Sequence, residues 1–90
     1  MNSPKSWDIH AAGPATKSLK RIPAKDRERI LAAITAMRED PFSGDVAYLQ
    51  NDPRAACRRR VGAWRIFFDV LPERRLVIVQ AIERRTSTTY

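Results

Sequence analysis

Apolar and polar residues alternate in several short stretches of the chain, as they do in β-strands with one buried face. The pattern predicts strands at residues 6–10, 56–61, 64–71 and 75–82. Two other segments repeat their apolar residues at helical spacing, which predicts helices at residues 15–22 and 24–40. The apolar face of the longer helix comprises Ile30, Leu31, Ile34 and Met37.

Proline and glycine separate these segments. Pro14 suits the first turn of a helix, and Pro23 ends the first helix. Residues 40–55 are irregular, whereas Gly62-Ala63 fits a two-residue hairpin turn. The expected fold is therefore α+β, in the order β-α-α-β-β-β, as a single domain over residues 1–90. Two N-terminal helices cover one face of a small, mostly antiparallel sheet, and the other face stays uncovered.

Strand alternation divides the predicted hairpin between two faces. If Gly62-Ala63 is the turn, paired residues across it share a face. The core face, toward the helices, then holds Cys57, Val61, Trp64, Ile66, Phe68 and Val70. The opposite face, which we call the arginine face, holds Arg58, Arg60, Arg65, Phe67 and Asp69. Arg59 alone falls on the core face, and we expect its side chain to reach solvent at the edge of the strand.

Charge narrows the classes of partner. The 90 residues contain 17 Lys and Arg against 10 Asp and Glu, a net charge of +7, which favours RNA, DNA or an acidic protein as partner. Residues 54–65 hold five arginines and no acidic residue. The single cysteine excludes an intrachain disulfide and a cysteine metal site. We expect no metal, no cofactor and no membrane association, and the absence of a signal-peptide pattern favours the cytoplasm.

The arginines have two interpretations. Arg60 and Arg65 would face each other across the hairpin, which destabilises the fold by up to about 1 kcal/mol. Either they are solvated and neutralised by Asp69 and Glu73, or they form an anion site, which the sparse acidic neighbours favour. Tyr90 follows the basic pair Arg84-Arg85, and cations near a phenol favour the phenolate that a general base needs. It is otherwise an ordinary terminal residue, and His10 is interpreted as an ordinary strand histidine.

Four stretches together resemble the RelE/ParE superfamily of toxins from bacterial type II toxin–antitoxin systems. They are "LKRIP", "DPFSGDVAYL", "RRRVGAWRIFFDV" and "AIERRTSTTY", and the resemblance covers nearly the whole chain. On the RelE side it implies an endoribonuclease that cleaves mRNA in the ribosomal A site and so inhibits translation. The chemistry is attack of a 2′-OH on the adjacent phosphate, which needs a base, cations for the developing charge and an acid.

The resemblance also implies roles for individual residues. The catalytic set is Arg58 near the leaving group, Arg65 on the scissile phosphate, Arg84 on the transition state and Tyr90 as base. The RNA-binding set is Arg54, Arg59, Arg60 and Arg85. Three features depart from the family pattern. Ala56 stands where a lysine is common, and arginine at position 58 stays protonated and so donates a proton poorly. The glutamate and histidine that form an acid–base pair in some related toxins have no counterpart.

Three functions remain open at this point. The first is the ribosome-dependent ribonuclease, with the 70S ribosome and mRNA as partners. The second is a ParE-type toxin that inhibits DNA gyrase and needs no cluster of catalytic residues. The third is a fold with degraded activity that still binds an antitoxin or RNA. Both toxin interpretations imply an acidic antitoxin protein as partner, since opposite charges speed association.

Overall fold

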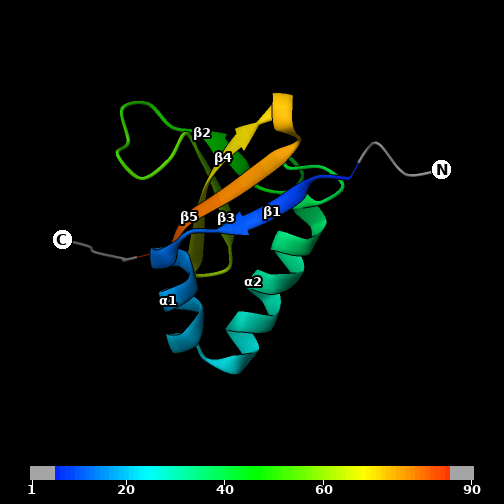
Figure 1. Cartoon of the computed structure of the whole chain (residues 1–90). Coiled ribbons are helices and arrows are strands. Elements are labelled where there is room, and N and C mark those ends of the chain that lie inside the picture. The colour runs from blue at the N-terminus through cyan, green and yellow to red at the C-terminus, as the bar shows by residue number, and fades with distance from the viewer. Residues whose placement is uncertain (1–5, 86–90) are drawn as a thin grey trace.

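The computed structural model describes residues 6–85, which form five strands, two helices and one short 3-10 helix (Figure 1). The elements follow the order β1 (Asp8–Ala11), α1 (Gly13–Arg21), α2 (Ala24–Met37), β2 (Val46–Tyr48), β3 (Cys57–Val61), β4 (Trp64–Leu71), η1 (Pro72–Arg74) and β5 (Leu76–Arg84). Pro14 lies in the first turn of α1, and Pro23 separates the two helices, as their backbone restrictions require. The predicted α+β fold is confirmed.

The strands form one sheet in the order β1-β5-β4-β3-β2. Only β1 runs parallel to its neighbour, β5, and all other pairs are antiparallel. Both helices lie on one side of this sheet, and the connection between β2 and β3 projects away from them (Figure 1). The core lies between the layers, where Ile30 and Met37 of α2 pack with Ile66, Phe68 and Val79 of the sheet.

Two expectations about these elements are wrong. The segment 40–55 contains the short edge strand β2, whose three residues are too few to alternate visibly among the surrounding proline, glycine and asparagine. Leu31 is 43% exposed and does not belong to the buried face of α2, where Ala33 takes its place beside Ile30 and Met37. The helical period of 3.6 residues brings Ala33, three residues after Ile30, onto that face and leaves Leu31 at its border.

The hairpin register agrees with the sequence prediction at every pair, from Cys57 opposite Phe68 to Val61 opposite Trp64. Gly62 has a φ of +58°, which a two-residue hairpin turn requires at its first position. The division into core face and arginine face is therefore confirmed for β3 and β4. Trp64 also joins the hairpin to the helices, because its indole N–H donates a hydrogen bond of 3.1 Å to Asp26 in α2.

A β-bulge interrupts the pairing of β4 with β5. Phe68 pairs with Val79, whereas its predecessor Phe67 pairs with Ala81, so Gln80 is an extra residue in β5. A bulge of one residue reverses the alternation of faces beyond it. Val79 and Ile82 consequently both point to the core, although they are three residues apart.

Candidate nucleic-acid interface

Three arginines gather on the arginine face, as the strand alternation predicts. Arg60 of β3 lies directly opposite Arg65 of β4, and Arg58 lies opposite Phe67 in the next pair of the same face. All three arginines are partly buried. No strand or helix described in residues 6–85 covers this row, but the Arg54 side chain covers Phe67 beside it.

These arginines make few internal hydrogen bonds. Within the described residues, Nη1 of Arg58 and the Nε atoms of Arg60 and Arg65 are buried and have no hydrogen-bond acceptor. Asp45, which precedes β2, lies 4.0 Å from Arg58 and 3.8 Å from Arg60, too far for a hydrogen bond. For Arg65, no carboxylate of the described segment lies within ion-pair distance.

Arg54 has a different environment from the other arginines. Its guanidinium lies 3.9 Å from the centroid of the Phe67 ring and is bonded to Asp52 at 2.8 Å and Glu83 at 2.6 Å. Hydrogen bonds from its side chain and its backbone N–H lower the pKa of Asp52 from 3.8 to about 2. Phe67 is only 1% exposed beneath it. Arg54, predicted to bind RNA, is thus held in an internal ion-pair network.

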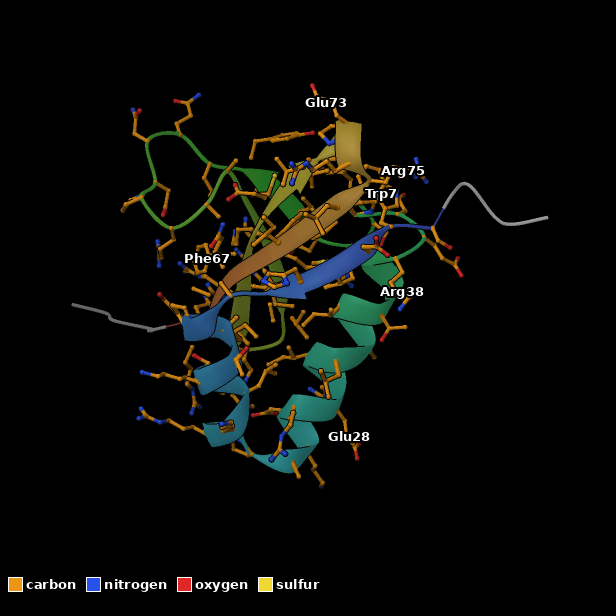
Figure 2. The ribbon with its side chains drawn as sticks, in the orientation of Figure 1. Trp7, Glu28, Arg38, Phe67, Glu73 and Arg75 are labelled. Carbon is orange, nitrogen blue, oxygen red and sulfur yellow. The ribbon has the colours of Figure 1, made fainter. Side chains whose placement is uncertain are left out.

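The arginine face is also more balanced in charge than the sequence suggests. Glu73, considered there as a neutralising residue, lies on η1 at the far end of the sheet from Phe67 (Figure 2). At that end Arg75 contacts Trp7, with its guanidinium carbon 4.7 Å from the ring centroid. Four carboxylates lie on or beside the arginine face and come from separate parts of the chain: Asp45, Asp52, Asp69 and Glu83.

Arg59 is on the core face, as predicted, but not at an edge of the sheet, because β2 pairs with β3 beyond it. Its side chain extends toward α2 and donates a hydrogen bond of 3.4 Å to the carbonyl of Ala33. The guanidinium also passes Gly44 so closely that a Cβ there would lie 2.5 Å from it. Arg59 therefore fastens the start of β2 to α2 and lies on the opposite side of the sheet from the other arginines.

The structure does not place Arg84 with Arg58 and Arg65. Arg84 pairs with Trp64, whose ring centroid is 5.9 Å from its guanidinium, and so lies on the core-face side of the sheet. The bulge at Gln80 causes this, because uninterrupted alternation from Val79 would put Arg84 on the arginine face. The backbone N–H of Arg85 donates to the carbonyl of Ala63, which continues the ladder and places Arg85 on the arginine-face side.

One acid–base candidate was predicted from the sequence, and a second was not. Tyr90, predicted as the general base, lies outside the described residues. Glu83 was missed in the sequence analysis, although it pairs directly with Arg65 on the arginine face. Sequence reasoning could have placed Glu83 on the arginine face only by knowing of the bulge, because simple alternation from Val79 assigns Glu83 to the core face.

The sequence matches no protein-family model, and a search of curated proteins gives no significant match. Solved structures do match. The RelBE2 toxin–antitoxin complex from Mycobacterium tuberculosis aligns at a TM-score of 0.79 and 13% identity, over 94% of this chain and 98% of that one. The archaeal RelE–RelB complex from Pyrococcus horikoshii OT3 aligns at 0.78 and 17% identity, over 92% and 99%. The chain has the RelE fold.

The isolated RelE toxin of E. coli shares this fold at a TM-score of 0.76 and 15% identity, over 92% of this chain and 88% of that one. The RelE fold accounts for the five-stranded sheet with its helical pair on one side. In residues 6–85, no three potential metal ligands among His, Cys, Asp and Glu lie grouped. No helix in that range is long and apolar enough to cross a membrane.

Proposed function

We propose that this protein is the toxin of a type II toxin–antitoxin system and a ribosome-dependent endoribonuclease that cleaves mRNA in the A site. One observation carries the proposal: in a RelE fold, three arginines share one exposed sheet face, and Arg65 among them has no carboxylate within ion-pair distance in residues 6–85. Like charges directly opposite each other destabilise a sheet, so an anion that binds them offsets this cost. A phosphate diester of single-stranded RNA is such an anion.

The proposed chemistry needs no metal ion. The RNA 2′-OH attacks the adjacent phosphate, its proton passes to a base, and the 5′-oxygen leaves with a proton, giving a 2′,3′-cyclic phosphate and a free 5′-OH. Arg65 and Arg58 hold the phosphate and stabilise the charge that builds on it in the transition state. Tyr90 serves as the base, and Glu83, directly opposite Arg65, is a second candidate for this role.

In this proposal the tail arginine near the phosphate is Arg85, since Arg84 lies on the other side of the sheet. The partners are the 70S ribosome with its mRNA and an acidic antitoxin protein, in the cytoplasm. The net charge of +7 supports both kinds of partner, because it attracts polyanions and speeds association with an acidic protein.

The deciding experiment maps mRNA 5′ ends on programmed 70S ribosomes with the purified protein and its variants. Wild type is expected to cut in the A site, and Arg65→Ala and Tyr90→Phe are each expected to reduce cleavage at least about a hundredfold. Arg85→Ala is expected to reduce it more than Arg84→Ala. Arg74→Ala, an exposed arginine on η1, is the matched control that keeps full cleavage. Intact mRNA together with inhibited DNA gyrase would replace this proposal with the ParE-type function.

A further inference from the structure

A pocket of about 520 Å³ lies beside the arginine row, where residues 49–56 fold against the sheet. Leu49, Pro53 and Ala55 contribute apolar lining, while Arg54, Asp69 and Gln80 contribute polar groups. Its volume falls within the range of roughly 300–1,000 Å³ that is typical of small-molecule sites. The lining is mostly polar, and it sets two carboxylates, those of Asp52 and Asp69, against one guanidinium, that of Arg54. Such a lining suits a base that offers hydrogen-bond donors better than a phosphate.

The polar end of the pocket presents fixed hydrogen-bond acceptors. One carboxylate oxygen of Asp69 accepts the backbone N–H of Ala56 at 2.8 Å, and the other accepts the side-chain amide of Gln80 at 3.0 Å. Each oxygen has a second lone pair, so the carboxylate can still accept two parallel bonds. Gln80 reaches Asp69 from the neighbouring strand, because Asp69 pairs with Ile78, two residues before Gln80 in β5. The side-chain carbonyl of Gln80 adds a further acceptor.

Arg54 supplies a flat surface at the other side of the pocket. Phe67 covers one side of its guanidinium, and Asp52 and Glu83 hold the group in place. The side chain nevertheless remains 37% exposed and lines the pocket. Proteins that bind single-stranded RNA commonly stack bases on guanidinium planes of this kind. Because two carboxylates neutralise it, Arg54 contributes a stacking plane here more than a net charge.

We propose that this pocket binds one base of the RNA substrate, with Arg54 as the stacking surface and Asp69 as the group that reads the base edge, and that it selects guanine. Guanine carries two adjacent donors, N1–H and N2–H, which match the two oxygens of a carboxylate. Adenine, cytosine and uracil offer no such pair of adjacent donors. The site deepens the proposed ribonuclease function and rests on it, since it gives that enzyme a preferred sequence.

The pocket lies within reach of an RNA strand held on the arginine row. Asp69 and Arg65 are on the same face of β4 and four residues apart, or about 13 Å along the strand. A base in the pocket therefore belongs to a nucleotide close to the one whose phosphate contacts Arg65. This spacing lets one short RNA segment occupy both sites.

The test uses the full chain, labelled with ¹⁵N, and trinucleotides with 2′-O-methyl ribose, which cannot be cleaved by 2′-OH attack. The probes are AGA, AIA with inosine, and AAA. AGA is expected to bind about tenfold or more tightly than AAA, with AIA between them because inosine lacks the N2 amine. The signals of the Gln80 side-chain amide and the Ala56 backbone amide are expected to shift, since both groups are bonded to Asp69.

Asp69→Asn is expected to remove the preference for guanine, while its amide carbonyl still accepts the Ala56 N–H and keeps the loop folded. Asp45→Asn, on the same side of the sheet but outside the pocket, is the matched control that retains the preference. Equal binding of AGA and AAA, or shifts that bypass Gln80 and Ala56, would overturn the proposal. If these signals shift when the antitoxin protein is added but not when any RNA probe is added, the pocket is a protein-docking site instead. Guanine binding without mRNA cleavage would refute the ribonuclease and leave the base site standing.

Discussion

At the scale of single residues, the neighbours of each arginine decide what it does. Arg54 and Arg65 are both arginines of the hairpin region, yet Arg54 is bonded to two carboxylates and stacked on Phe67. Arg65 instead faces Arg60 and, within the described residues, has no carboxylate within ion-pair distance. The charge of the first side chain is used inside the fold, whereas that of the second has no such internal partner among the described residues. The sequence shows the same letter at both positions and cannot separate these roles.

This contrast predicts opposite effects on stability. Arg54→Ala is expected to lower the free energy of unfolding by about 1 kcal/mol, because it removes partly exposed ion pairs and a cation–π contact. Arg65→Ala is expected to leave it unchanged or raise it by up to about 1 kcal/mol, since it relieves repulsion from Arg60. Urea unfolding of the two variants and wild type measures both changes. A larger loss for Arg65→Ala than for Arg54→Ala would contradict the assignment of roles.

Asp52 makes the stability of this region depend on pH. Its pKa is about 2 in the folded protein against an ordinary 3.8, so the folded state favours the charged carboxylate. The resulting stabilisation is complete above about pH 4 and is lost as the pH falls toward 2. Asp52→Asn is therefore expected to be less stable than wild type at pH 6 and equally stable at pH 2. Urea unfolding at both pH values checks this, and a constant difference would show that Asp52 does not act through its charge.

At the scale of elements, sequence alternation predicted β1, β3, β4 and the register of the hairpin, but it missed the edge strand β2 and the bulge in β5. It succeeded where Gly62-Ala63 fixed the pairing and each face had a clear character. It missed β2, which has only three residues. The family resemblance grouped Arg84 with Arg58 and Arg65, and it missed the extra residue Gln80, which leaves no mark in the pattern of apolar and polar residues. The position of Arg59 depended on β2 and could not be predicted without it.

The connection that leads into β2 offers a test of how Arg59 fastens it. Gly44 has a φ of +85°, and an added Cβ would lie 2.5 Å from the Arg59 guanidinium. Gly44→Ala is expected to lower the free energy of unfolding by about 1–3 kcal/mol, through backbone strain and the clash together. In an Arg59→Ala background the clash is gone, so the same substitution is expected to cost less. Urea unfolding of the double-mutant cycle measures the difference, and additive effects would exclude the contact.

At the scale of the whole molecule, the net charge of +7 does not come mainly from the arginine face. Four carboxylates stand on or beside that face and balance much of its charge. Exposed lysines and arginines on the helices, such as Lys17, Lys20 and Arg29, contribute to the excess elsewhere. Specific binding of RNA is thus expected to depend on few residues, and general attraction to polyanions on many.

Salt dependence separates these two contributions. If three arginines contact phosphates, the logarithm of the affinity for single-stranded RNA is expected to fall with the logarithm of salt concentration at a slope of about −2. Arg65→Ala is expected to reduce the slope by about 0.7, because one phosphate contact is lost. Arg74→Ala on η1 is the control that leaves it unchanged. Fluorescence anisotropy at several salt concentrations gives the slopes, and equal slopes for wild type and Arg65→Ala would remove Arg65 from the interface.

The bulge at Gln80 also determines how this chain can be compared with others of its fold. The alternation of side chains between the two faces shifts by one residue at Gln80, so positions before and after it follow opposite parity. An alignment that passes through β5 without a gap equates Arg84 with residues that, in an unbulged relative, stand on the opposite side of the sheet. An alignment that places a gap opposite Gln80 instead matches Glu83 and Arg85 with positions on the arginine face. The one extra residue in β5 thus decides which side chains at the end of that strand lie on the arginine face.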